Sequence, residues 1–282
     1  MWQLIYGAAT DSEATVYARW LGAPTDVDLS RRLTLQGPYC SLSRTLRASF
    51  EMRRESERLW KTTVTDPCFW SAELPARYGL KIGDQRTSIV EMGIRRFGGR
   101  GSDLYLNGRR WVFRAIDTGG VPKAPWDSIR EAMLSVIVRG EVDQLAAVAS
   151  ERGVMLAIST DTFEPSCVMR WSRWPAVAML ILPSRVDIDR DQFKAQVPNL
   201  LLGCEVVAST EKLPTWADVY FASNDAKILR RVRTEAPEQP LIAVHESPEE
   251  WKDATVARRS CEQLQASLAP DFDLSGYVVR FV

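Results

Sequence analysis

Few side chains in this sequence could carry chemistry. His245 is the only histidine, so any serine–histidine or cysteine–histidine mechanism would have to use it. It lies at the end of a predicted strand, where a lone histidine is more often a hydrogen-bonded structural residue. Because histidine is the commonest ligand at catalytic metal sites, metal catalysis is disfavoured. We therefore expect no metal and no cofactor.

Charged residues at the ends of three other predicted strands are further candidates. Asp117 follows the first strand, Arg139 with Glu141 follows the second, and Asp161 follows the third. Each could take part in catalysis, and each could equally be a helix cap or a solvated loop charge. Without known mutual geometry they define no site.

The segment from Val186 to Phe193 superficially resembles a calcium-binding loop. It departs from that pattern at Gln192, where such a loop needs glycine, and at Pro198, where it needs glutamate. Asp189 or Asp191 is better interpreted as the N-cap of a helix.

Strands and helices must position these candidates, and the second part of the chain supplies them. Short, nearly continuous apolar runs recur there, which is typical of parallel strands covered by helices. Eight such runs in succession predict a barrel closed on itself. The runs are Trp111–Ile116, Ser135–Arg139, Val154–Ser159, Val177–Leu182, Leu200–Val207, Asp218–Ala222, Leu241–His245 and Gly276–Val282. Helical periodicity is found after Trp126 and over Glu141–Gly153, Asn224–Ala236 and Pro248–Ala269.

The first 95 or so residues alternate apolar and polar positions between turn residues, which predicts half-buried antiparallel strands. A small β-sandwich is the natural interpretation, and the turn-rich stretch Arg95–Asp103 is a plausible boundary. The fold class is therefore a small immunoglobulin-like β-sandwich (1–97) followed by a compact (β/α)8 TIM-type barrel (98–282). From Trp111 to Val282 each of eight units would have about 22 residues, so this barrel has short loops.

Composition excludes several classes of protein. The 36 Lys and Arg residues balance 36 Asp and Glu residues, so nucleic acid is a poor partner. The N-terminus lacks the pattern of a signal peptide, and the longest apolar run, Ala176–Leu182, is too short to span a membrane. Five scattered cysteines without a Cys-x-x-Cys pair indicate reduced thiols. We expect a soluble, cytoplasmic protein that binds neither nucleic acid nor membrane.

Two stretches suggest a family. Asp66–Gly83 reads DPCFWSAELPARYGLKIG, and Gly93–Ile116 reads GIRRFGGRGSDLYLNGRRWVFRAI. The first resembles the end of the immunoglobulin-like domain of glycoside hydrolase family 2, the β-galactosidase and β-glucuronidase family, and the second resembles that family's passage into its barrel. Asp143–Ser159 and Arg173–Leu182 are more weakly similar to later barrel segments of the family.

The residues of these motifs have structural explanations of their own. Asn107-Gly108 is the dipeptide that favours a two-residue hairpin turn with positive φ at both positions. Trp70 and Tyr78 stand where a sandwich needs large aromatic residues in its core or interface. Neither motif carries chemistry.

The resemblance implies a retaining glycosidase site with two carboxylates, but this chain departs from the family at both. Aligned on Pro175, Arg185 occupies the position of the acid/base glutamate after the fourth strand, and arginine cannot protonate a leaving oxygen at neutral pH. At the position of the nucleophile, which ends the seventh strand, stands His245, followed by Glu246. A slip of one residue would restore Glu246, although adjacent strand residues point to opposite sides, so only one can face the pore.

Three functions follow as alternatives. The first is a catalytically inactive relative of the family that acts as a structural or protein-interaction subunit, in contact with a partner protein or a second copy of itself. The second is a non-catalytic carbohydrate-binding protein. The third is an active retaining β-glycosidase with relocated carboxylates, such as Glu246 with Asp161 or Asp117. Stacking platforms for a sugar could come from Trp126, Trp171, Trp174, Trp216 and Trp251.

Overall fold

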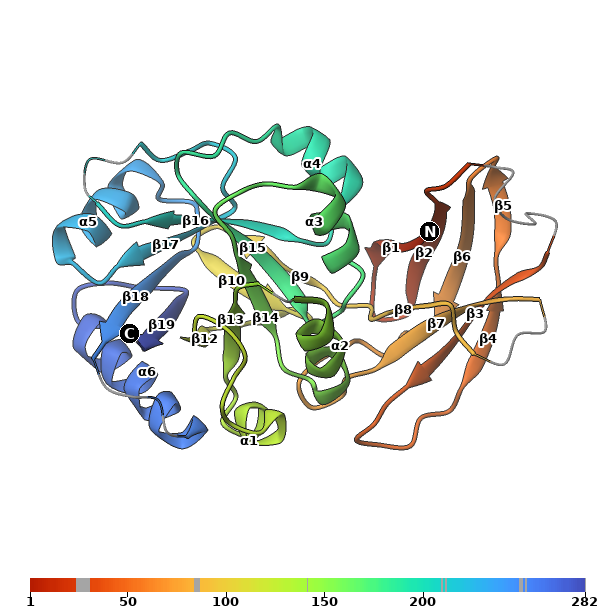
Figure 1. Ribbon diagram of the computed structural model, residues 1–282, viewed down its shortest axis with the longest axis horizontal. Coiled ribbons are helices and arrows are strands. Elements are labelled where there is room, and N and C mark those ends of the chain that lie inside the picture. The colour runs from red at the N-terminus through yellow and green to blue at the C-terminus, as the bar shows by residue number, and fades with distance from the viewer. Residues whose placement is uncertain are drawn as a thin grey trace.

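The computed structural model describes residues 1–23, 31–83, 87–140, 142–208, 210, 212–248, 251 and 253–281. Figure 1 shows a two-layered β part on one side, which contains the N-terminus, and a barrel on the other, which contains the C-terminus. The predicted fold class, a β-sandwich followed by a parallel barrel, is confirmed.

The sandwich consists of two antiparallel four-stranded sheets. One has the order β1 (Trp2–Ala9), β2 (Glu13–Trp20), β6 (Leu59–Thr65), β5 (Arg53–Ser56), and the other β4 (Ala48–Glu51), β3 (Leu33–Tyr39), β7 (Arg77–Ile82), β8 (Val90–Met92). Alternate residues of β2, namely Ala14, Val16 and Ala18, are completely buried and face Leu35 and Leu80 of the other sheet in one apolar core. The period-two pattern of the sequence therefore identifies the inner face correctly.

A small three-stranded sheet follows, made of β9 (Phe97–Arg100), β10 (Asp103–Leu106) and β11 (Arg109–Arg110). Asn107 and Gly108 connect the last two strands with φ of 51° and 82°, as the dipeptide predicts. Trp70 and Tyr78 are each 1% exposed, Trp70 in the barrel core and Tyr78 in the sandwich core. The indole Nε1 of Trp70 donates to the Ser150 carbonyl at 2.9 Å and so links the two parts.

Eight parallel strands close the barrel, each next to its successor in sequence, and the last pairs with the first. They are β12 (Phe113–Asp117), β13 (Ser135–Val138), β14 (Leu156–Ser159), β15 (Val177–Pro183), β16 (Leu201–Val206), β17 (Val219–Ser223), β18 (Leu241–Ser247) and β19 (Gly276–Phe281). All eight predicted runs form these strands, with differences of one or two residues at their ends. The final residue of the last predicted run, Val282, lies outside the described residues.

Six helices occur in the described part of the barrel. They are α1 (Trp126–Glu131), α2 (Val142–Arg152), α3 (Pro165–Trp171), α4 (Arg190–Gln196), α5 (Ala226–Glu235) and α6 (Ala254–Leu268). Asp189 is the N-cap of α4, because its carboxylate accepts from the Gln192 amide at 3.0 Å, as one of the two predictions for this segment had it. Three of the helices have only 6 or 7 residues, so the β/α units of this barrel are short in their helices as well as in their loops.

The interior of the barrel is filled by side chains from alternate strand residues. The rings of Phe113 and Phe221 meet edge to face with centroids 5.9 Å apart. Glycines on neighbouring strands make room for them: a Cβ atom at Gly203 would lie 2.7 Å from the Phe221 ring, and one at Gly276 would lie 2.5 Å from the Phe113 carbonyl oxygen. The pattern of inward residues is therefore fixed as 113, 115 and 117 on β12 and 276, 278 and 280 on β19.

We expect Gly276→Ala to lower the free energy of unfolding by about 1–3 kcal/mol, because the added methyl has no space beside Phe113. The matched control is Gly98→Ala, where a Cβ would meet nothing within 4 Å. Urea denaturation followed by tryptophan fluorescence measures both. Equal midpoints for the two variants would contradict this packing.

Candidate functional site

Asp117 ends the first barrel strand and is completely buried at the carboxyl end of the barrel. Arg139, just after β13, binds both of its oxygens, with Nη1–Oδ1 and Nη2–Oδ2 distances of 2.8 and 3.0 Å. Arg280 of β19 donates from Nε to Oδ2 at 2.8 Å. Asp117 pairs with Arg280 in the register of β12 and β19, so both side chains point to the same side of the sheet. A buried carboxylate is thereby paired with two cations.

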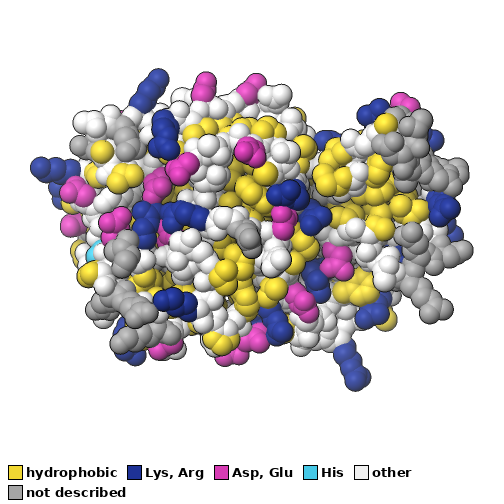
Figure 2. All heavy atoms as spheres, in the orientation of Figure 1, with side chains coloured by type: hydrophobic (Ala, Val, Ile, Leu, Met, Phe, Trp, Pro, Cys, Tyr) yellow, Lys and Arg dark blue, Asp and Glu magenta, His cyan; other side chains and the backbone are white. Residues whose placement is uncertain are grey.

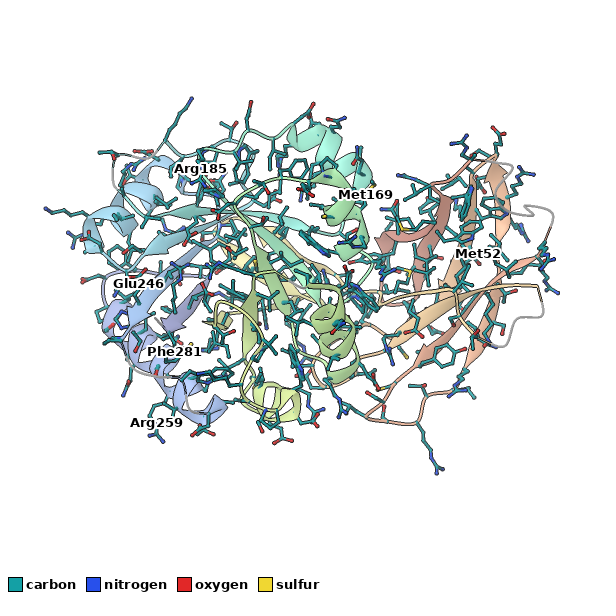
Figure 3. All side chains as sticks on the ribbon, viewed as in Figure 1. Met52, Met169, Arg185, Glu246, Arg259 and Phe281 are labelled. Carbon is teal, nitrogen blue, oxygen red and sulfur yellow. The ribbon has the colours of Figure 1, made fainter. Side chains whose placement is uncertain are left out.

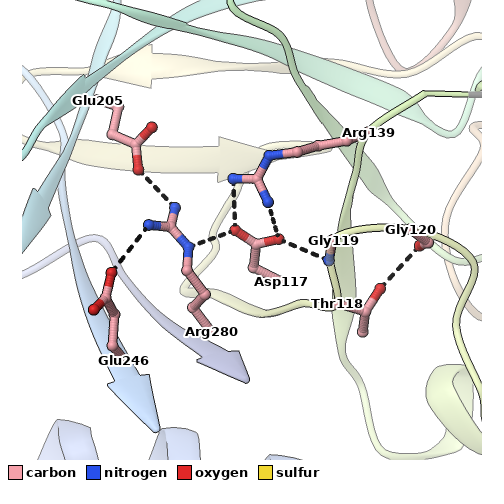
Figure 4. A network of polar contacts seen from close by, with 8 residues as sticks. All are labelled: Asp117, Thr118, Gly119, Gly120, Arg139, Glu205, Glu246 and Arg280. Carbon is pink, nitrogen blue, oxygen red and sulfur yellow. Dashed lines mark hydrogen bonds and ion pairs between the residues drawn. The ribbon is translucent and has the colours of Figure 1, made fainter. Parts of the chain in front are cut away.

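Arg280 also contacts two glutamates, so one guanidinium joins three carboxylates (Figure 4). Its Nη2 lies 2.6 Å from Oε1 of Glu205, and its Nη1 lies 3.5 Å from Oε1 of Glu246. The three side chains differ in exposure: 20% for Arg280, 24% for Glu205 and 63% for Glu246. The network thus runs from the buried interior to the solvent.

The charge of Arg280 is stabilised by this arrangement. Burial lowers the pKa of its guanidinium, but the hydrogen bonds and charges of Glu205 and Asp117 outweigh burial, and the pKa lies above its ordinary value. Arg280 is therefore a permanent cation that cannot donate a proton to a reacting group.

A cavity of about 320 Å³ opens beside this network at the carboxyl ends of β16 to β19. Its walls include Glu205, Glu246 and Arg280, together with Phe221, Ser223, Asn224, Val244 and His245. In barrels of this kind, the carboxyl end is where active sites are built. The cavity is therefore the candidate site.

The two neighbours His245 and Glu246 point to opposite sides of β18. Glu246 pairs in register with Arg280, and His245 with Val279. The Glu246 side chain therefore faces Arg280, whereas His245 turns towards Asn224, with Nδ1 3.2 Å from Nδ2 of that residue at the edge of the same cavity. Glu246 therefore faces the pore, as expected if the alignment with the nucleophile position of the family is shifted by one residue.

Arg185 and Asp161 do not enter the cavity. They form an ion pair of 3.2 Å with each other, and their side chains are 69% and 87% exposed. Figure 3 shows Arg185 well separated from Glu246. Of the residues proposed from sequence, Asp117 and Glu246 both contact Arg280, and Arg139 contacts Asp117. Arg185 and Asp161 lie apart from them. Glu141 lies outside the described residues.

Sequence reasoning missed Glu205 and Arg280, which organise the site. Their signal was present: each is the only charged residue of an otherwise apolar predicted strand run, LLLGCEVV and GYVVRFV, and stands near its carboxyl end. A charge in such a position needs a buried partner. Within the described ranges, no three His, Cys, Asp or Glu side chains are arranged to hold a metal ion.

Solved structures share this fold. A glycosyl hydrolase family 2 member from Bacteroides cellulosilyticus matches with a TM-score of 0.64 at 13% identity over 99% of this chain. The chain has a glycoside hydrolase family 2-like fold. A Bifidobacterium dentium β-glucuronidase complexed with coumarin-3-O-glucuronide matches with a TM-score of 0.61 at 11% identity over 99% of this chain. A putative β-galactosidase from Bacteroides fragilis matches with a TM-score of 0.59 at 13% identity over 98% of this chain.

The match covers 43%, 59% and 54% of these three proteins, so this chain spans about half their length. No protein-family model and no curated protein matches the chain. Because the identities are so low, the likeness establishes the fold, and function has to be argued from the site.

We expect Arg280→Met to lower the free energy of unfolding by about 3 kcal/mol, because it removes one of the two cations of buried Asp117 and the close partner of Glu205. Arg185→Met, which breaks the exposed pair with Asp161, should cost under about 1 kcal/mol. Chemical denaturation of both variants measures the difference. If the two losses are equal, the network does not stabilise the barrel.

Proposed function

We propose that this chain is a non-hydrolytic protein with a glycoside hydrolase family 2-like fold that acts as a structural or protein-interaction subunit. The observation that carries the proposal is the position of Arg280, whose guanidinium contacts Asp117, Glu205 and Glu246 at once. A retaining glycosidase needs one carboxyl group that gives a proton and another that attacks the sugar, about 5–5.5 Å apart.

The ion pairs work against both roles. Glu205 and Glu246, the two carboxylates at the cavity wall, lie on either side of a permanent cation. The sugar of a retaining glycosidase lies between its two carboxylates. Here the guanidinium of Arg280 takes that place, in contact with Oε1 of each glutamate. Asp117 is completely buried and is held by two arginines. The pairs proposed from sequence, Glu246 with Asp161 or with Asp117, therefore offer no working couple.

A partner protein would bind at the surface. Figure 2 shows hydrophobic side chains reaching the surface over both the barrel and the sandwich, between charges of both signs. Where such side chains form a continuous patch, they can mark contacts between proteins. Size-exclusion chromatography with light scattering tests for a second copy of the chain as that partner. The described helices include none long and apolar enough to cross a membrane.

Carbohydrate binding without hydrolysis is the second candidate, favoured by the open cavity and its polar wall of Ser223, Asn224, His245 and Glu246. None of the five tryptophans considered as stacking platforms lines that cavity. Trp216 and Trp251 are 4% and 5% exposed, and the other three are partly buried against the barrel core. A sugar would be held mainly by hydrogen bonds, which calorimetric titration with a panel of monosaccharides can detect.

We expect no turnover above background when the purified chain is incubated with a panel of chromogenic β-glucuronides, β-galactosides and β-glucosides. Glu246→Gln and Glu205→Gln should give the same baseline as the unaltered chain, because neither carboxylate serves as acid or nucleophile. Release of chromophore is the measurement. Turnover that either substitution abolishes would overturn the proposal in favour of the active glycosidase.

A further inference from the structure

A second, much smaller cavity lies between the sandwich and the barrel. It has a volume of about 20 Å³, which is room for one particle of the size of a water molecule or a monatomic ion. The sandwich side contributes Tyr6 of β1 and Arg95, which follows β8. The barrel side contributes the turn between α3 and β15, with Arg173 and Trp174, and also Asn199.

Arg95 is a buried cation without an anionic partner. It is 3% exposed, and none of the ion pairs found in the described part of the chain includes it. Its Nη2 donates to the carbonyl groups of Val177 and Asn199, but Nε and Nη1 are buried and have no hydrogen-bond partner. A buried charge that is not neutralised is strongly unfavourable, so this site calls for a negative charge.

Two further donors at the cavity lack a partner. Nε1 of Trp174 and Nε of Arg173 are buried and lack a hydrogen-bond partner. The Tyr6 hydroxyl is a hydrogen-bonding neighbour of Arg95. Burial raises the pKa of Tyr6 although the charge and hydrogen bonding of Arg95 oppose that rise, so this neighbour is uncharged and does not neutralise Arg95. Arg173 lies over the Trp174 ring at 4.6 Å and meets Asp143 only at 3.9 Å, which leaves a second positive charge close by.

We propose that this cavity binds a single monatomic halide, chloride under physiological conditions, between the sandwich and the barrel. Two arginines and an indole N–H supply charge and donors, as a monovalent anion requires. A cavity of about 20 Å³ favours a monatomic anion over phosphate or sulfate, and a cation would face Arg95. The anion would connect Arg95 on the sandwich side with Trp174 on the barrel side. This inference is independent of whether the barrel hydrolyses glycosides.

Thermal unfolding of the full chain in sodium chloride or sodium gluconate, at constant ionic strength, tests the proposal. Chloride should raise Tm by about 2–4 °C over gluconate, because a ligand bound only by the folded state stabilises it. Trp174→Phe, which keeps the ring and removes the N–H, should reduce the chloride-dependent rise, and Arg95→Met should abolish it. The control is Arg53→Met, at an exposed arginine of β5, which should keep the full rise.

Crystals of the unaltered chain grown in sodium bromide give a second measurement that does not depend on the folding of a variant. An anomalous bromine peak between Arg95 and Trp174 is the expected result. A Tm that is the same in chloride and gluconate, or a cavity that contains only water in bromide, would overturn the proposal.

Discussion

A completely buried carboxylate, Asp117, stands between two arginines at the carboxyl end of the barrel. Charges taken out of water need partners, and the pairing of Asp117 depends on the last strand reaching the first. Arg280 lies on β19, which closes the barrel by pairing with both β12 and β18. The same residue extends to Glu205 on β16 and Glu246 on β18, so one side chain joins four strands electrostatically. The pairing of β19 with β12 that closes the barrel therefore also places Arg280 where it neutralises these carboxylates.

This requirement bears directly on chemistry. The carboxyl end of a barrel is where this fold usually places reacting groups, because side chains from several strands converge there. Here the side chains that converge balance one another's charge: Arg280 contacts three carboxylates, and Arg139 binds one of them, Asp117. The adjoining cavity remains open to ligands, and its wall offers hydrogen-bonding groups. Such a surface is suited to binding without bond cleavage, whereas a sugar placed between Glu205 and Glu246 for cleavage would have to displace Arg280.

The architecture could be predicted from sequence because buried parallel strands leave a strong mark: all eight apolar runs became barrel strands. Helices α3 and α4 were harder, since each has only 7 residues, too few for a clear helical period. The boundary proposed at residues 97 and 98 stays a prediction; the chain there forms the sheet of β9, β10 and β11.

The site was less predictable because it depends on register. The choice between His245 and Glu246 is decided by the pairing of β18 with β19, which no local pattern reveals. Arg185 was aligned with a catalytic position, yet its side chain is 69% exposed, and the arginine that meets the pore carboxylates is Arg280, 95 positions later in the chain. Conversely, Asp117 was found because a charge directly after a buried strand is conspicuous.

Whether any carboxylate at the cavity can attack a sugar is tested most directly by covalent trapping. The chain is incubated with activated fluorosugars that trap the glycosyl-enzyme intermediate of retaining β-glycosidases, beside an active retaining enzyme as a positive control, and intact masses are measured. The ion pairs of Arg280 predict an unchanged mass for this chain and a sugar adduct for the control. A stoichiometric adduct that peptide mapping assigns to Glu246 or Glu205 would contradict the account.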